Sequence, residues 1–234
     1  MVHMSSLASV IHNRRKPYAG LQMEGPLAAW YARSTRDRPD FPITAAKIAE
    51  RLPAGSAILE VAPGPGYLSI ELVKRGIYRV SGLDISHSFV RIASENAQQA
   101  GVSIDFRQGD VARMPFADST FDFIVCQAAF KNFPEPVAAL NEIHRVLRPG
   151  GNVSIYDLRK DAPADAIEHE IQSMRLPAIN AVLMRLIFRF ALLRAAYTRT
   201  RLESVVARSR FGQGELVNDG VGFELKLAKS ATSS

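Results

Sequence analysis

The chain has 234 residues, of which 47% are hydrophobic, so it is long and apolar enough for one packed α/β domain and is not globally disordered. Its 29 Lys and Arg residues against 23 Asp and Glu residues give a net charge of +6, which permits acidic partners without requiring them. The single cysteine, Cys126, excludes an internal disulfide and a multi-cysteine metal site, and it favours a reducing compartment such as the cytoplasm.

The first residues of the chain are polar. Residues 1–16 have no apolar core and end in a basic triplet, unlike a secretory signal, so we interpret them as a flexible tail. We expect residues 17–42 to form a helical cap that carries Trp30 and Tyr31. A helix should follow over 43–52, with Ile43, Ala46, Ala49 and Leu52 facing the core.

Strands and helices then alternate, which favours parallel βαβ units in a doubly wound, Rossmann-like sheet. The turn chemistry agrees with this order. Gly76 is expected to end a helix in the left-handed conformation, and Ser86 is expected to cap the next helix. Strands are expected at 57–61, 78–83, 102–107, 121–126 and 152–157, and helices at 68–75, 86–100 and 136–147.

After Leu158 the alternation ends. Residues 159–200 are predicted to be a helical insertion, with two helices divided by Pro177, and Thr198 is expected to cap a further helix. Two strands, 213–217 and 222–228, then flank the hairpin signal Asn218-Asp219-Gly220. The sequence therefore predicts one domain over 17–234, with a seven-stranded, mostly parallel sheet, an antiparallel C-terminal hairpin and helical lid insertions.

The longest apolar stretch, 178–197, is interrupted by Arg185, Arg189 and Arg194. An arginine at the centre of a bilayer costs a few kcal/mol, which argues against a transmembrane span. Four interpretations of this stretch stay open: a buried helix, a helix on a membrane surface, the face of a homodimer, and a lid over an apolar substrate.

A glycine loop follows the first strand. The run 58–67 reads as a buried strand that ends near an acid, then a tight turn with Gly64 and Gly66, and then a helix. Glycine lets a backbone approach a ligand closely. Ser69 stands where a dinucleotide fingerprint has its third glycine, and no Lys-Ser or Lys-Thr pair follows, so the loop fits neither NAD nor a phosphate-cradling P-loop.

Acidic residues end the first three strands. Asp84 lies 18 residues after Gly66 (84 − 66), close to the spacing at which a carboxylate meets ribose hydroxyls. Asp110 and the Val111 N–H can read an adenine edge. Glu60 repels phosphates and suits an ammonium group. Together these residues predict a ligand that contains adenosine without a pyrophosphate.

These motifs resemble class I S-adenosylmethionine (SAM)-dependent methyltransferases, and most closely the type 11 branch with its quinone-biosynthesis-like small-molecule enzymes. The resemblance covers residues 43–158, about half of the chain. The motifs that carry it are 58–67, 80–86, Gly109-Asp110-Val111-Ala112-Arg113-Met114-Pro115-Phe116, Phe121-Asp122-Phe123-Ile124 and Arg145-Val146-Leu147-Arg148-Pro149-Gly150-Gly151.

The resemblance implies roles for matched positions and SAM as the cofactor, with no metal. Ala62, followed by Pro63, stands where the family usually has glycine, which stiffens the turn. The implied cofactor-binding residues are Glu60, Ala62, Gly64 and Gly66 at the methionine part, Asp84 at the ribose, Ile85 beside the adenine, Asp110 and Val111 at its edge, and Gln127 and Ala128 at the methyl-donor pocket.

Substrate contacts are weighed against ordinary packing for five residues: Trp30, Tyr31, Phe130, Lys131 and Asn132. His144 and Cys126 are interpreted as core residues. No catalytic residue is assigned, because no sequence pattern identifies a general base. The leading hypothesis is methyl transfer to a small, apolar acceptor.

Two other functions stay open. One is a methyltransferase-like binding module without turnover. The other is a nucleic-acid methyltransferase, but residues 127–130 lack the Asp/Asn-Pro-Pro-aromatic run of amino-group DNA methylators, and Cys126 lacks a preceding proline. We therefore expect no nucleic-acid partner.

Overall fold

The computed structural model describes residues 23–173, 178–187 and 192–231. The predicted tail 1–16, the first part of the predicted cap and Pro177 lie outside the described residues.

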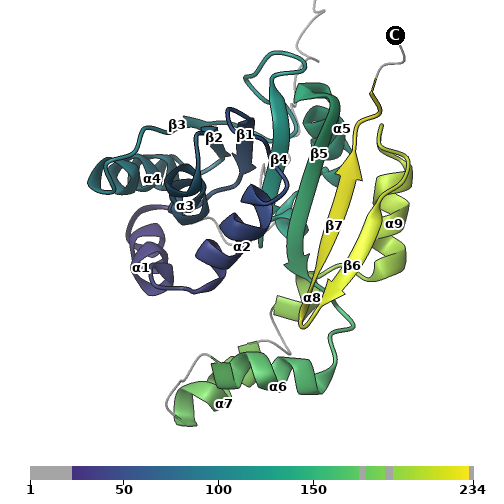
Figure 1. Cartoon of the computed structure of the whole chain (residues 1–234). Coiled ribbons are helices and arrows are strands. Elements are labelled where there is room, and N and C mark those ends of the chain that lie inside the picture. The colour runs from purple at the N-terminus through teal and green to yellow at the C-terminus, as the bar shows by residue number, and fades with distance from the viewer. Residues whose placement is uncertain (1–22, 174–177, 188–191, 232–234) are drawn as a thin grey trace, which may run out of the picture.

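The core of the fold is a seven-stranded sheet with the strand order β3-β2-β1-β4-β5-β7-β6 (Figure 1). The first five strands of this order are parallel, and β7 pairs antiparallel with both β5 and β6. The expected mostly parallel sheet with an antiparallel C-terminal hairpin is thus confirmed. The strands are β1 Ala57–Val61, β2 Arg79–Asp84, β3 Asp105–Gln108, β4 Phe121–Gln127, β5 Leu147–Leu158, β6 Glu215–Asp219 and β7 Gly222–Ala228.

Helices cover both faces of the sheet. On one face, α2 (Asp40–Ala49) and α3 (Tyr67–Arg75) pack against Ile58 and Val80, and α1 (Gly25–Thr35) packs on α4 (His87–Gln99). On the other face, α5 (Pro136–Val146) and α9 (Arg199–Ala207) pack against Ile124. All five residues of β1 are buried because successive side chains enter the two opposite cores.

The predicted caps and the C-terminal turn are present. The Ser86 hydroxyl accepts from the Phe89 N–H at 3.0 Å, and the Thr198 hydroxyl accepts from the Arg201 N–H at 3.3 Å. Asp219 pairs with Gly222, which leaves a two-residue hairpin loop in which Gly220 has a φ of 53°.

Several local predictions were wrong. The third strand begins at Asp105 instead of residue 102, and the fifth begins at Leu147 instead of residue 152. The second helix begins at Asp40 because a proline in the first turn needs no intrahelical N–H partner, and its buried residues are Thr44, Ala45 and Ile48, whereas Ile43 is 54% exposed. Gly76 is extended, with φ −173° and ψ 178°, and its lack of a Cβ leaves room for the Tyr78 ring, which would lie 2.9 Å from that atom.

The insertion after β5 contains α6 (Ala164–Ser173), α7 (Ala178–Ile187) and α8 (Leu193–Ala195). In Figure 1, α6 and α7 stand off from the sheet, beyond the end of β5. Within the described ranges, no helix combines the length and the hydropathy that a membrane span requires.

Candidate functional site

The candidate site lies at the carboxyl ends of β1, β2 and β4. Val61 of β1 pairs in parallel register with Leu83 of β2 and Cys126 of β4, so the residues that follow these three strands emerge at one edge of the sheet. The strand order reverses between β1 and β4, which is where open α/β sheets bind ligands.

The glycine loop is held to β2 by a hydrogen bond at its start and is packed against α4 at Gly66, whereas Gly64 between them faces open space. The Ala62 N–H donates to the Leu83 carbonyl at 2.8 Å, and a Cβ on Gly66 would lie 2.8 Å from the Phe106 ring and 3.0 Å from Ala93 Cβ. A Cβ on Gly64 would meet no described heavy atom within 4 Å. Gly66 therefore permits close packing on α4, and Gly64 leaves space for a ligand beside the backbone.

Ala62 has a φ of 55°, which is the left-handed region. An alanine there costs about 1–2 kcal/mol because its Cβ approaches the following carbonyl. This conformation explains why a glycine suits the position. The loop nevertheless keeps its turn, with Pro63 buried behind it.

Asp84 connects the loop to the second strand. Its Oδ2 accepts from the Gly64 N–H at 3.0 Å, and its Oδ1 accepts from the Ser86 N–H at 2.9 Å. Burial raises the pKa of Asp84 to about 6, although the hydrogen bonds from Ser86 and Gly64 act in the opposite direction. Each carboxylate oxygen has a second lone pair, so Asp84 can hold the loop and still accept from hydroxyl groups of a ligand.

Glu60 points into the layer between β1 and α3. Its side chain accepts from the Ser69 hydroxyl at 2.5 Å, and the residue is 3% exposed. Burial raises the pKa of Glu60 to about 8, against the opposing hydrogen bond from Ser69. The acid is therefore mostly protonated at neutral pH, and the residue at the third-glycine position is its hydrogen-bond partner, a role that the sequence pattern did not reveal.

The loop after β3 lies next to Asp84. The Gly109 N–H donates to the Asp84 carbonyl at 2.9 Å, and Asp110 Oδ1 accepts from the Ala112 N–H at 2.9 Å. Asp110 thus caps its own turn while Val111 and Ile85 stay half-buried beside it.

The end of β4 contacts the start of α2. Gln127 Nε2 donates to Asp40 Oδ2 at 2.9 Å, and Arg38 binds the same carboxylate through two hydrogen bonds of 2.9 Å. Gln127 Oε1 is buried and has no hydrogen-bond partner among the residues that the structure describes. Ala128 is exposed, with a φ of 60°. The cap therefore reaches the mouth of the site through Arg38 and Asp40, neither of which the sequence marked.

The residues after Ala128 are fixed by packing. Lys131 Nζ lies 2.8 Å from Asp157 Oδ1 and 2.7 Å from the Ala128 carbonyl. Phe130 is fully buried between Phe133 and Tyr197. Lys131 is thus held by an ion pair and a hydrogen bond, and Phe130 by contacts with two aromatic rings.

Two of the other proposed substrate contacts, Trp30 and Tyr31, lie on α1, whereas Asn132 directly follows Lys131 and its N–H donates to the Ala129 carbonyl at 2.9 Å. Trp30 is 58% exposed on α1, and Tyr31 is half-buried with its ring edge against Phe89. Asn132 is half-buried. The Glu24 carboxylate anchors the start of α1 because it accepts from the His87 and Ser88 N–H groups at 3.0 Å each.

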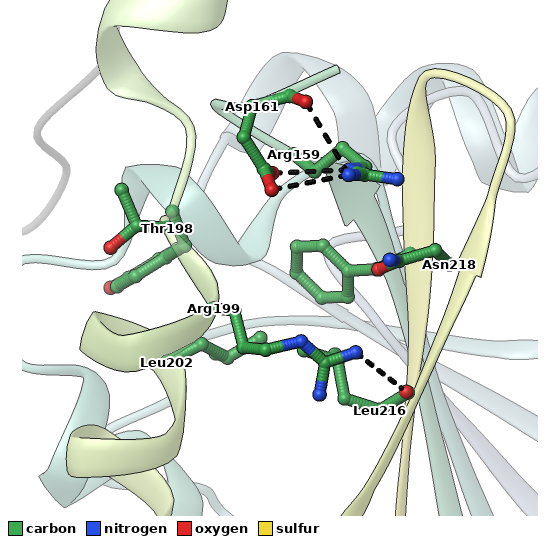
Figure 2. Close-up of a pocket in the computed structure, with 9 residues that line it drawn as sticks. Arg159, Asp161, Thr198, Arg199, Leu202, Leu216 and Asn218 are labelled. Carbon is green, nitrogen blue, oxygen red and sulfur yellow. Dashed lines mark hydrogen bonds and ion pairs between the residues drawn. The ribbon is translucent and has the colours of Figure 1, made fainter. Parts of the chain in front are cut away.

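A small hollow lies between α9 and the C-terminal hairpin (Figure 2). Figure 2 shows the Arg159–Asp161 ion pair on one side and Arg199 reaching the Leu216 carbonyl on the other. Its volume of about 10 Å³ holds at most a water molecule. Across the described ranges, no group of three or more His, Cys, Asp or Glu side chains is arranged to hold a metal ion.

The sheet order and the helices on both faces define a Rossmann-like α/β fold. Residues 59–155 match the family model Methyltransf_11, described as a methyltransferase domain. The resemblance seen in the sequence is thereby confirmed.

Known proteins support this assignment to different extents. A ubiquinone/menaquinone biosynthesis C-methyltransferase UbiE from Bdellovibrio bacteriovorus is 39% identical over 107 residues, which cover 44% of this chain and 45% of that protein. The chain thus spans about half the length of the curated relatives it matches.

Two solved structures share the fold. A candidate S-adenosyl-L-methionine-dependent methyltransferase from Methanococcus maripaludis has a TM-score of 0.71 and 22% identity, over 96% of this chain and 99% of that chain. The [4+2]-cyclase SpnF has a TM-score of 0.55 and 22% identity, over 81% of each chain. At this identity the likeness concerns the fold alone.

Proposed function

We propose that the protein transfers a methyl group from SAM to a small, apolar acceptor with a quinone-type ring. One relationship carries the proposal: Asp84 ends the second strand of a methyltransferase domain and accepts the Gly64 N–H of the glycine loop, so ribose-binding acid and loop form one unit. The open space beside Gly64 and the unpartnered Gln127 Oε1 fit a ligand along this edge.

The residues present fit SAM in the following way. Asp84 would accept from the ribose hydroxyls, and the Asp110 turn with Val111 would read the adenine. The backbone at Gly64 would lie along the methionine part, and Gln127 with Ala128 would line the donor pocket. The bound sulfonium would supply an electrophilic methyl group.

Positioning accounts for most of the catalysis in this proposal. Methyl transfer from a sulfonium is an in-line displacement in which charge disperses, so alignment and exclusion of water lower the barrier without a strong acid. Lys131 and Asp157 fix the backbone that follows Ala128, and Asp40, paired with Arg38, accepts a hydrogen bond from Gln127.

The acceptor class rests on the UbiE relative, whose name gives C-methylation in quinone biosynthesis. A cytoplasmic location and the lack of a nucleic-acid partner stay predictions of the sequence.

The test combines binding and turnover. Calorimetry should show SAM and S-adenosylhomocysteine binding, and labelled SAM should methylate a member of a panel of demethylated benzoquinols and naphthoquinols. Failure to bind either compound at high micromolar concentration would contradict the proposal.

A second function is a binding or non-methylating role on the same scaffold. Two observations favour it: the strained Ala62 in the loop, and the shared fold of the [4+2]-cyclase, since one fold serves different chemistries. Binding of SAM without methylated product from the panel would favour this second function.

A further inference from the structure

The connection between β3 and β4 is held by two charged residues of α5. Glu142 and Arg145 lie three positions apart, so they share a face of the helix. Glu142 Oε2 accepts from the Met114 N–H at 2.9 Å, and Arg145 Nη2 donates to the Met114 carbonyl at 3.1 Å. Both backbone polar groups of Met114 are therefore bound by α5.

Arg145 uses every donor of its guanidinium group. Nη1 donates to the Phe116 carbonyl at 2.8 Å and to Asp118 Oδ1 at 2.7 Å. Nε and Nη2 each donate to the Glu142 carboxylate at 2.8 Å, which lowers the pKa of Glu142 and keeps this acid charged at neutral pH. Together with the Met114 carbonyl, these acceptors occupy all five N–H groups of the arginine, whereas a lysine has only three donors.

Met114 directly follows the turn that carries Asp110 and Val111. The Ala112 N–H donates to Asp110 Oδ1 and the Arg113 N–H donates to the Asp110 carbonyl, both at 2.9 Å. Arg113 closes this turn and is the chain neighbour of Met114, so a shift of the Met114 backbone would move the turn. The hydrogen bonds from α5 therefore restrict the positions that the Asp110 carboxylate and the Val111 N–H can take.

We propose that Arg145 and Glu142 are positioning residues for the recognition of adenine. They hold the Asp110 carboxylate and the Val111 N–H at the spacing that the exocyclic amine and a ring nitrogen of the base require. This inference rests on the proposed function, because it takes SAM as the ligand. It also gives a role to Arg145 as the first residue of the sequence motif 145–151, which supplies none of the proposed cofactor contacts.

The effect of these two residues falls on the base end of the cofactor. Gly64 and Asp84, which contact the methionine part and the ribose in the proposed function, are joined by a hydrogen bond of their own at 3.0 Å. Loosening the turn at Asp110 should therefore weaken recognition of the base and leave the other contacts in place. A purely structural role of Arg145 would instead change the affinity for every cofactor analogue by the same factor.

The experiment compares two ligands that differ only at the base. S-adenosylhomocysteine has the exocyclic amine that can donate to Asp110, whereas S-inosylhomocysteine has a carbonyl oxygen in its place, which a carboxylate repels. In calorimetry, the unmodified protein should prefer the adenosine compound by at least about tenfold. R145K keeps the positive charge and loses the planar set of five donors, so it should lower this preference at least about threefold.

Amide hydrogen exchange of the protein without ligand reports on the turn itself. The Ala112 and Arg113 N–H groups should exchange faster in R145K than in the unmodified protein, because the turn opens more often. E142Q keeps an acceptor for the Met114 N–H and removes the charge opposite Arg145. It should change the exchange rates and the base preference in the same direction but by less, and it replaces R145K if that variant does not fold.

The matched control is R51K. Arg51 also forms a half-buried ion pair, at 2.9 Å from Glu224, and Glu224 lies on β7, which four strands of the sheet separate from β3. R51K should leave both the base preference and the exchange of the turn unchanged, and circular dichroism should show all variants folded.

Three results would overturn the positioning role. They are a folded R145K that keeps the full preference, a loss of affinity by the same factor for both compounds, and an equal change of preference in R51K. If the unmodified protein binds neither compound, the proposed function fails and the adenine role fails with it. Selective binding by both the unmodified protein and R145K would contradict the positioning role alone, so the two failures are distinguishable.

Discussion

Lys131 and Asp157 form a buried ion pair. Lys131 Nζ lies 2.8 Å from Asp157 Oδ1, and the two side chains are 9% and 0% exposed. Asp157 also accepts from the N–H groups of Lys131 and Leu158 at 2.8 Å. The ends of β4 and β5 are thereby joined directly behind Ala128, at the site where the acceptor should enter.

We predict that K131M lowers the free energy of unfolding by about 3–5 kcal/mol, because it leaves the buried Asp157 carboxylate without its counter-charge. Urea unfolding measures this change. The control is K226M, which removes a half-buried lysine 3.5 Å from the exposed Glu215 and should cost at most about 1 kcal/mol. Equal losses in the two variants would show that the buried pair is not held as the geometry indicates.

Glu60 makes stability depend on pH in an unusual direction. Its pKa is about 8 in the folded chain against an ordinary value of 4.5, so between these two values the folded state binds more protons than the unfolded state. Stability should therefore fall as pH rises from about 4.5 to about 8, by a few kcal/mol at most, and should level off above that range.

The variant E60Q should flatten this dependence, because glutamine can accept from Ser69 without titrating. Chemical unfolding at a series of pH values measures the slope. E71Q, at a partly exposed position on the same helix layer, should keep the slope of the unmodified protein. A slope that E60Q leaves unchanged would assign the dependence to another group, with Asp84 the first alternative because its pKa is also raised.

Sequence signals predicted the fold well where a feature depends only on residues that are neighbours in the chain. The β1 segment, apolar except for Glu60, the caps Ser86 and Thr198 and the turn at Gly220 are each encoded by neighbouring residues, and each is present in the structure. The prediction of which α2 residues are buried was wrong, because the inward face of a helix depends on what the helix packs against. The buried face of α2 includes Ile48, which packs with Ile58 and Leu72.

In the candidate site, too, the contacts between residues far apart in the chain were not predicted. The spacing from Gly66 to Asp84 predicted a carboxylate for ribose hydroxyls, and it did not predict the hydrogen bond that Asp84 accepts from the Gly64 N–H. The Asp40–Gln127 contact joins residues 87 positions apart, and the Glu60–Ser69 pair depends on which face of β1 the acid occupies. Neither contact can be predicted from a pattern in one sequence.

Replacing Ala62 by glycine should raise the free energy of unfolding by about 1 kcal/mol, because the left-handed φ of 55° strains alanine more than glycine's extra freedom costs. Thermal and urea unfolding would both report the gain. The control A138G, in the first turn of α5, should instead lose stability, by about 1 kcal/mol at most. If A62G is destabilised to the same extent as A138G, the loop does not hold Ala62 in this conformation.

Asp84 provides the sharpest test of the cofactor site. D84A should weaken SAM binding in calorimetry by at least about tenfold, because it removes the acceptors that we propose for two ribose hydroxyls and releases the Gly64 N–H. D105A changes an exposed acid at the start of β3 that pairs with Arg107, and it should bind SAM like the unmodified protein.

The pH profile of binding separates a direct role of Asp84 from a structural one. Because its pKa is about 6, protonation below that pH removes the carboxylate that we propose as the acceptor of both hydroxyls, so SAM affinity should decline as pH falls through about 6. Bound SAM favours the charged form and should itself lower this midpoint. An affinity that is constant between about pH 5 and 8 in a folded protein would place the ribose elsewhere along the strand ends.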